Sequence, residues 1–226
     1  MISSLIPKFI RKKIYTRVRN SILKSLKKQS DAIPKTQLAL ESISSARLLP
    51  TREVLLDHLP KDGIVAELGV DKGEFSEKIL SINEPKKLHL IDVWATERYH
   101  QGKRIEVENK FRKQIDNGKV EINIGYSTKI VNQFPEEYFD WIYIDTDHSY
   151  EVTRLELELW CSKIKPGGFI CGHDYILGNW NGLIRYGVIE AVHEFCFEKN
   201  WEILYLTMEL DISPSFVIRK NRNENL

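Results

Sequence analysis

Several short stretches of this sequence combine residue types that could bind a ligand or move a proton. One is the turn Glu67-Leu68-Gly69-Val70-Asp71-Lys72-Gly73. Gly69 would let the backbone approach a ligand, and Gly73 would open a helix. An acid at Glu67 would repel a pyrophosphate and suits a ligand that carries an ammonium group. The turn is neither the GxGxxG of dinucleotide sites, because Asp71 replaces the second glycine, nor a P-loop. An ordinary strand-to-helix turn is the alternative.

Further candidates stand at the ends of the next two apolar runs. Asp92 follows Glu67 by 25 residues and could accept both hydroxyls of a ribose. A helix cap is its alternative role. Ser127, after Gly125, could face an adenine. Trp94 could stack on that adenine, although a tryptophan of the core is equally consistent with the sequence.

The elements that must position these residues alternate between strand and helix from Asp62 onward. We expect strands at residues 64–69, 87–92, 120–124, 139–145, 169–172, 202–206 and 215–218, and helices at 73–80, 103–117, 149–164 and 183–199. This alternation predicts an α/β fold with a doubly wound, mostly parallel sheet covered on both faces. The short link between the last two strands predicts a C-terminal antiparallel hairpin. Ligands of such sheets bind at the carboxyl ends of the strands, near the switch point.

Together these residues resemble the class I S-adenosylmethionine-dependent methyltransferases, over about residues 62–218. Glu67-x-Gly69-x-x-x-Gly73 is similar to the family's first motif, and Asp92 to its ribose-binding acid. The resemblance implies a Rossmann-like, seven-stranded sheet. It also implies S-adenosylmethionine (SAM) as donor, held by the cofactor-binding set Glu67, Gly69, Gly73, Asp92, Trp94 and Ser127.

A finer resemblance rests on Ile144-Asp145-Thr146-Asp147-His148 and Gly172-His173-Asp174-Tyr175. These stretches look like those of bacterial small-molecule and sugar O-methyltransferases and of the metal-dependent catechol-type enzymes. The resemblance implies a divalent-metal site at Asp145, His173 and Asp174, with Asp145 and His148 as catalytic residues and His148 as general base. His173 departs from the usual oxygen ligand, so Mn²⁺ competes with Mg²⁺, and a site without metal is the alternative. For His148 the alternative is a helix cap.

The expected activity is O-methylation of a small-molecule hydroxyl, with a carbohydrate as the favoured acceptor. The segment 175–186, which contains Trp180, is the candidate acceptor loop. Two rival functions stay open: a methyltransferase acting on RNA or protein through a basic arm, and a non-catalytic binding protein. Asp145-Thr146-Asp147-His148 is not the Asn/Asp-Pro-Pro-Tyr type of tetrapeptide found in amino-methylating members, so we expect no nucleic-acid partner.

Charge divides the 226 residues into an arm and a body. Residues 1–30 hold nine Lys and Arg and no acid, whereas the rest carries a net charge of −8. Ile10, Ile14, Val18 and Ile22 recur every four residues, which predicts a basic amphipathic helix over residues 2–29. Such a helix could lie on an anionic membrane, pack on the body or another subunit, or act as a mitochondrial transit peptide.

The predicted organisation is therefore a helical arm at 1–30, a helical lead-in at 31–61, a methyltransferase domain at 62–220 and a polar tail at 221–226. Within the lead-in we expect a helix near 36–49 that ends at Pro50. No apolar run is long enough for a transmembrane helix. Three cysteines without a CxxC pair favour a reducing compartment, and we expect a cytoplasmic protein with possible peripheral membrane contact.

Overall fold

The structure is a computed structural model that describes residues 7–179 and 181–221. Residues 1–6 of the predicted arm, Trp180, and residues 222–226 of the predicted tail lie outside the described residues. The helices are α1 (Lys8–Ala32), α2 (Arg52–His58), α3 (Glu74–Lys78), α4 (Gln101–Lys110), α5 (Arg112–Asp116), α6 (Ser127–Ile130), α7 (Tyr150–Trp160) and α8 (Val188–Lys199). The strands are β1 (Arg47–Leu49), β2 (Ile64–Leu68), β3 (Lys87–Asp92), β4 (Val120–Ile124), β5 (Phe139–Ile144), β6 (Ile164–Gly172), β7 (Gly178–Asn179), β8 (Ile184–Arg185), β9 (Trp201–Thr207) and β10 (Phe216–Lys220).

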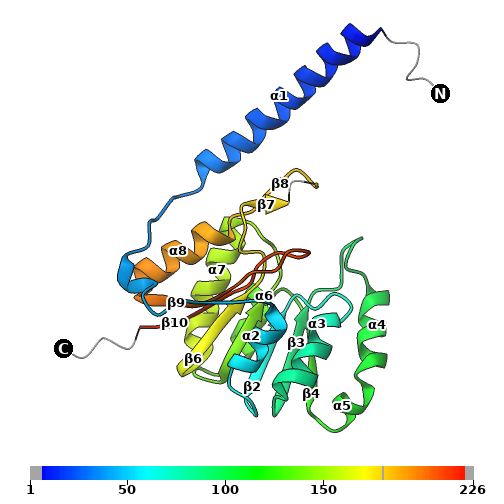
Figure 1. Cartoon of the computed structure of the whole chain (residues 1–226). Coiled ribbons are helices and arrows are strands. Elements are labelled where there is room, and N and C mark those ends of the chain that lie inside the picture. Colours follow the sequence, from blue (N-terminus) through cyan, green and yellow to red (C-terminus); the bar gives the residue numbers. More distant parts are fainter. Residues whose placement is uncertain (1–6, 180, 222–226) are drawn as a thin grey trace.

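One large twisted sheet organises the body (Figure 1). Its strand order is β1-β9-β10-β6-β5-β2-β3-β4. Strands β2 to β6 pair in parallel, and β10 runs antiparallel to both β6 and β9. This confirms the doubly wound α/β fold and the C-terminal antiparallel hairpin, which is formed by β9 and β10. A separate two-stranded hairpin, β7–β8, stands outside the sheet.

The sheet has eight strands instead of the seven expected, because β1 pairs in parallel with β9. The helix predicted near 36–49 is wrong: the structure has a short 3-10 turn at Leu40–Ser42, and residues 47–49 form β1. The edge of β9 offers unpaired backbone groups, and pairing with them outweighs the local helical pattern. The chain then enters α2, whose first turn is capped by the Thr51 hydroxyl.

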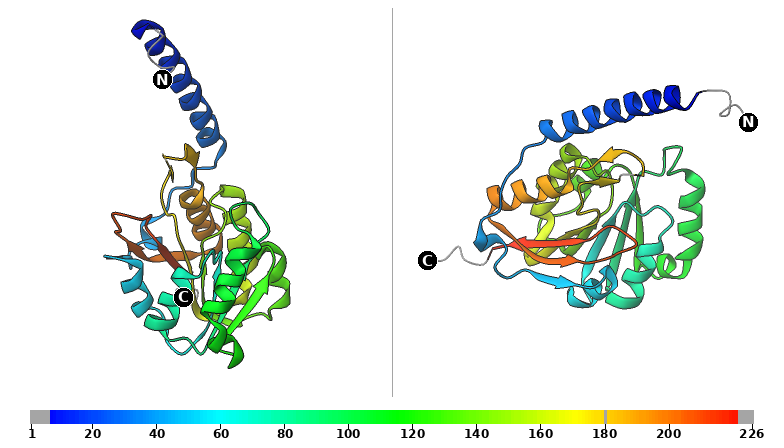
Figure 2. Two further views of the ribbon diagram at one scale, coloured as in Figure 1. Left: turned by 90° about the vertical axis from the view of Figure 1, so that its right-hand side faces the viewer. Right: turned by 45° about the horizontal axis from the view of Figure 1, so that its top comes forward.

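Two hydrophobic clusters cover the two faces of the sheet, and β5 shows how one strand supplies both. Ile142 and Ile144 pack with α6, α7 and α8, whereas Trp141 and Tyr143 pack with α2, α3 and α4. Successive side chains of a strand point to opposite faces, so a nearly continuous apolar run is needed where both faces are covered. The layers are visible from two further directions (Figure 2).

The helix predicted for residues 183–199 begins later, at Val188. The first residues of that range form β8 instead, and Gly187 lies so close to Tyr150 that a Cβ would stand 2.3 Å from the Tyr150 nitrogen. Within the described part of the chain, none of the helices has both the length and the apolar character needed to cross a bilayer.

Candidate functional site

The carboxyl ends of the central strands are tied together at the switch point of the sheet. Strand β2 lies between β3 and β5. The strands that follow β2 are added first on its β3 side and then on its β5 side, so the strand order reverses at β2. The backbone nitrogen of Gly69 donates to the Ile91 carbonyl at 2.8 Å, and that of Asp145 donates to the Leu68 carbonyl at 2.7 Å. The nitrogen of Gly125 likewise donates to the Asp92 carbonyl at 2.9 Å. The predicted site residues at these strand ends therefore share one rigid edge.

Gly69 occupies a position that no other residue can take without movement. Its φ is +87°, and a Cβ placed on it would lie 1.9 Å from the carbonyl oxygen of Asp145. Gly73 follows at φ +69° and begins α3, with the Phe111 ring where its Cβ would be. Both glycines singled out by the sequence are thus required by the tight passage from β2 to α3.

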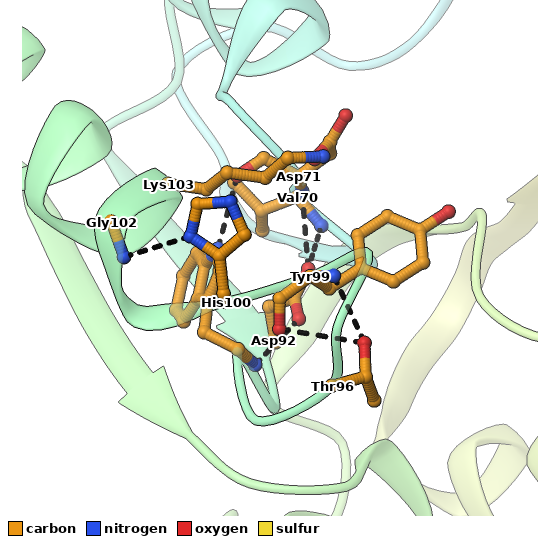
Figure 3. Close-up of polar contacts among 9 residues, drawn as sticks. Val70, Asp71, Asp92, Thr96, Tyr99, His100, Gly102 and Lys103 are labelled. Carbon is orange, nitrogen blue, oxygen red and sulfur yellow. Dashed lines mark hydrogen bonds and ion pairs between the residues drawn. The ribbon is translucent and has the colours of Figure 1, made fainter.

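Asp92 fixes the glycine turn to the end of β3 (Figure 3). One carboxylate oxygen accepts from the backbone nitrogens of Val70 and Asp71, at 2.8 and 3.0 Å, and the other accepts from that of Trp94 at 3.0 Å. A carboxylate offers about four acceptor positions, so capacity remains for a ligand hydroxyl. Asp92 orders the turn, and its contact with a ribose stays a prediction.

The loop after Asp92 folds back over the same turn (Figure 3). Trp94 is only 4% exposed, packs in the core, and donates its indole N–H to the Asp71 carbonyl at 3.0 Å. This position matches the core alternative and leaves the predicted stacking on adenine without an accessible ring. Lys103 pairs with the Asp71 carboxylate and lies over the Tyr99 ring, 4.9 Å from its centroid.

Glu67, the acid that the sequence assigns to a ligand's ammonium group, is a buried side chain. It is 2% exposed and accepts a hydrogen bond from the Ser76 hydroxyl, and burial raises its pKa to about 8. A carboxyl group with that pKa is mostly protonated at neutral pH. Because the side chain lies beneath the turn, any effect on an ammonium group acts through the protein around it.

Ser127 belongs to a buried cluster that sequence reasoning missed. Its hydroxyl donates to Glu156 of α7, which also accepts from the Thr146 hydroxyl at 2.7 and 2.8 Å. Glu156 is fully buried, and this burial raises its pKa to about 7. The cluster links the segments that follow β4 and β5. The sequence signal that could have indicated this cluster is the position of Glu156 on the buried face of α7, between Thr153 and Trp160.

Four ionisable side chains meet where β5 and β6 end. His148 Nδ1 lies 3.1 Å from Asp174 Oδ2. His173 Nδ1 lies 3.7 Å from Asp145 Oδ2 and 3.6 Å from Asp174 Oδ2. The structure thus brings the predicted metal ligands Asp145, His173 and Asp174 together with the predicted base His148.

Among the described residues, Asp145, His148 and Asp174 form the group whose ligand atoms all lie within 4.8 Å of one another. His148 therefore joins the candidate ligand set in the place where the sequence favoured His173. The Nε2 atom of His173 is buried and has no hydrogen-bond partner within the described ranges. Ser149, not His148, caps α7, with its hydroxyl 3.4 Å from the Val152 nitrogen, so the capping alternative for His148 is wrong.

Electrostatics within the cluster favour a positively charged partner for its carboxylates. Burial raises the pKa of Asp145. Burial would also raise the pKa of Asp174, but hydrogen bonds from His173 and Ser213 and the charges of the His148 and His173 imidazoles outweigh this and lower it. For His173, burial opposes the charged form, but the carboxylates of Asp174 and Asp145 prevail and raise its pKa. The guanidinium of Arg52, which sequence reasoning missed, also acts on Asp145 and lies over the Phe75 ring at 4.4 Å.

Two hollows on the surface of the described residues differ in their lining. The larger one lies away from these strand ends, beside α4, α5 and β4, and is lined by Lys87, Glu108, Arg112, Ile115, Asp116, Gly118, Val120, Glu121 and Ile122. The smaller one is lined by Ile144, Thr146, Asp147, His148, Thr153, His173, Val188 and Phe216. The base candidate His148 lines the smaller hollow, which lies at the sheet edge that also carries the glycine turn.

Comparisons with known proteins bear on the type of domain. Residues 66–175 match a family model described as a methyltransferase domain. This range contains Gly69, Asp92, Asp145 and Asp174. Among curated proteins, none matches the sequence.

Solved structures are similar at the level of fold. The M1A22 tRNA methyltransferase TrmK of B. subtilis is 13% identical with a TM-score of 0.54, over 76% of this chain and 67% of that one. A Streptococcus mutans protein described as a methyltransferase, in complex with SAH, is 15% identical with a TM-score of 0.52, over 74% and 93%. Fibrillarin of Aeropyrum pernix, with natively bound S-adenosyl-L-methionine, is 12% identical with a TM-score of 0.54, over 74% and 73%. Residues 66–175 therefore match a methyltransferase domain, and the fold is similar to that of solved methyltransferases that bind S-adenosylmethionine or SAH.

Proposed function

We propose that this domain transfers a methyl group from SAM to a hydroxyl oxygen of a small molecule, with a sugar or sugar-bearing metabolite as acceptor class. The observation that carries the proposal is the 3.1 Å contact between His148 Nδ1 and Asp174 Oδ2 at the ends of β5 and β6. A hydroxyl group is a weak nucleophile until a base takes its proton. An imidazole oriented by a carboxylate is suited to that task.

The pairing determines which imidazole nitrogen can act as base. A carboxylate only accepts hydrogen bonds, so Asp174 favours the tautomer in which His148 Nδ1 carries the proton. His148 Nε2 then keeps its lone pair and can take the acceptor's proton. The lowered pKa of Asp174 keeps it ionised, and the ionised carboxylate stabilises the imidazolium that forms.

The donor fits the charge of this sheet edge. SAM supplies a methyl group already activated on a positively charged sulfonium, and it also carries an ammonium group. Carboxylates of Asp71, Asp92, Asp145 and Asp174 border the glycine turn and the cluster. The residues that would hold the donor are Gly69, Asp92 and Ser127, with Glu67 beneath them. The chain's own task is to align the acceptor oxygen and exclude water.

A divalent cation is the second candidate for acidifying the acceptor. Two carboxylates and one imidazole, in Asp145, Asp174 and His148, form a donor set that suits Mn²⁺ better than Mg²⁺. A cation bound there would lower the pKa of the acceptor hydroxyl. If His148 Nδ1 binds the cation, it cannot also donate to Asp174, so the two arrangements exclude each other and chelation separates them.

The segment 175–186 supports a polar, ring-shaped acceptor. It forms the β7–β8 hairpin beside the cluster, and the Tyr186 ring lies 4.6 Å from the His148 ring, centroid to centroid. Aromatic faces and amides, such as that of Asn179, suit the faces and hydroxyls of sugars. The residues after β5 also lack the tetrapeptide typical of amino-methylating relatives, which supports oxygen as the methylated atom.

The test measures the formation of SAH, the demethylated product of SAM, by the purified protein. Three acceptor types are compared: a panel of methyl glycosides, catechol, and an unmodified tRNA transcript. We expect turnover with a glycoside and none with the tRNA. Turnover with the tRNA alone would overturn the proposal. His148→Ala should lower the rate with the active acceptor by about 10²–10⁴-fold, the usual contribution of a general base. His58→Ala, an exposed histidine at the end of α2, is the matched control and should leave the rate unchanged.

Chelation then decides between base and cation. With His148 as base, activity persists in EDTA and the pH–rate profile loses its acid limb in His148→Ala. With a cation at the cluster, EDTA abolishes activity and Mn²⁺ restores it. A His148→Ala variant with unchanged rate and unchanged pH profile would remove both roles for this residue.

A further inference from the structure

We propose that α1 holds the protein on an anionic lipid surface, with the helix lying along that surface. The proposal concerns the arm and does not depend on which acceptor is methylated. Helix α1 runs for 25 residues, all of them described, and none of its side chains is buried. In Figures 1 and 2 it extends away from the sheet and past the β7–β8 hairpin.

The arm exposes large apolar side chains that the body does not cover. Phe9 is 71% exposed and Val18 54% exposed, and Ile10, Ile14, Tyr15 and Leu23 are exposed as well. Packing of the arm along the body is therefore wrong for most of its length. Only near its C-terminal end, at Ile22 and Leu26, are apolar side chains of α1 half-buried. The helix also contacts β8. Uncovered apolar side chains concentrated on one element indicate a binding surface.

Five of the apolar residues form a stripe that winds along the helix. Ile10, Ile14, Val18, Ile22 and Leu26 are spaced by four, and each step turns the stripe by about 40° because each residue advances about 100°. Most of the Lys and Arg side chains lie around the remaining circumference. Long basic side chains can keep their charge at lipid head groups while the apolar stripe enters the acyl boundary.

Charge favours lipid over a second copy of this helix. Helix α1 holds nine basic residues and a single acid, Asp31. Two such helices side by side would place like charges together along their length, which opposes association. A surface of anionic head groups attracts every one of these charges.

The apolar stripe also separates lipid from RNA. The phosphate backbone of RNA would satisfy the basic residues but offers no partner for Ile14 and Val18. A bilayer interface takes up both kinds of side chain at once. Because α1 leaves the body beside β8, and the β7–β8 hairpin follows Asp174, the catalytic edge and the membrane-binding helix lie on one side of the molecule.

The experiment is vesicle flotation of the full chain, with phosphatidylcholine vesicles compared with vesicles that contain about a third of phosphatidylglycerol. We expect flotation with the anionic vesicles at low ionic strength and a strong loss at high ionic strength, where screening shortens to about 3 Å. Each basic residue near an anionic surface changes partition by about fivefold, so Lys12→Gln/Lys13→Gln/Lys24→Gln should lower it by about 100-fold.

The matched control makes the same change of charge on the body. Lys78, Lys86 and Lys113 are exposed, and their triple change to Gln should leave flotation as in the wild type. The variant Ile14→Ser/Val18→Ser keeps every charge and should lower partition by about tenfold or more. All three variants should melt at the wild-type temperature, because the altered side chains support no core.

Three results would overturn the proposal. The first is no flotation of the wild type with anionic vesicles at low ionic strength. The second is a dimer in sedimentation velocity that Ile14→Ser/Val18→Ser converts to monomer, which would assign the stripe to a second copy. The third is flotation unaffected by Ile14→Ser/Val18→Ser together with tight binding of the tRNA transcript, which would assign the basic face to nucleic acid.

Discussion

Replacing Gly69 by Ala should disable the donor site more than it destabilises the fold, and Gly118→Ala provides the matched comparison. Both glycines have positive φ, +87° at Gly69 and +76° at Gly118. A Cβ on Gly118 meets nothing within 4 Å, whereas on Gly69 it would lie 1.9 Å from the Asp145 carbonyl oxygen. The two variants share the cost of a left-handed alanine, and only Gly69→Ala adds a collision between two strand ends.

The magnitudes follow from these distances. A left-handed alanine costs about 1–2 kcal/mol. Because real Cβ atoms essentially never lie under 3.0 Å from another heavy atom, the turn after β2 or the end of β5 must move by about 1 Å. Overpacking of this kind costs about 1–3 kcal/mol more. At about 2–4 °C per kcal/mol for a chain of this size, Gly118→Ala should lower the melting temperature by about 2–8 °C and Gly69→Ala by more.

Calorimetric titration with SAH measures the functional part of this prediction. A displacement of about 1 Å can cost 10²-fold where geometry matters, so we expect Gly69→Ala to weaken SAH binding by about that factor. Gly118→Ala should bind SAH like the wild type. The reasoning is refuted if folded Gly69→Ala binds SAH with wild-type affinity.

Three further substitutions test other parts of the site. Asp92→Ala leaves three backbone N–H groups without their acceptor. It should weaken SAH binding at least tenfold in calorimetry and lower the unfolding free energy in urea by about 3 kcal/mol or more. Asp57 is an exposed acid, and Asp57→Ala should change neither quantity. Trp94→Phe should lower the melting temperature and change SAH affinity by less than about threefold, whereas a large loss of affinity in calorimetry would restore stacking on adenine. Glu156 has a pKa of about 7 in the folded chain against an ordinary 4.5, so the folded state binds this proton more tightly and the unfolding free energy falls as pH rises from about 4.5 to 7. Glu156→Gln should remove that part of the fall in urea titrations over this pH range, and an unchanged slope would contradict the assigned burial.

The central strands could be predicted from sequence because their patterns are local and strongly constrained. Strands β3 and β4 have the predicted bounds, since each is a short β-rich run closed by turn residues. Strand β1 could not be predicted in this way. Its three residues gain their hydrogen bonds only from β9, more than 150 positions later in the chain. Pairing over such a distance leaves no periodic signal at Arg47–Leu49.

The site residues, too, could be predicted where neighbouring residues determine their positions and could not where distant segments do. Gly69, Gly73 and Asp92 could be predicted because the turn that needs them is formed by neighbouring residues. Which histidine joins Asp145 and Asp174 depends on how the segments after β5 and β6 fold towards each other, and this is set by packing against Tyr186 and Gly187. The buried acid Glu156 was missed because an acidic residue in a helix is ordinarily read as exposed.

The central claim is that the donor lies across the glycine turn, between Asp92 and the cluster of Asp145, His148 and Asp174. The most direct measurement is the electron density of crystals grown with SAH. We expect SAH at the carboxyl ends of β2 and β3, over Gly69, with its ribose hydroxyls on the Asp92 carboxylate and its sulfur facing the cluster. SAH bound elsewhere, such as in the hollow beside α5 and β4, would contradict the account.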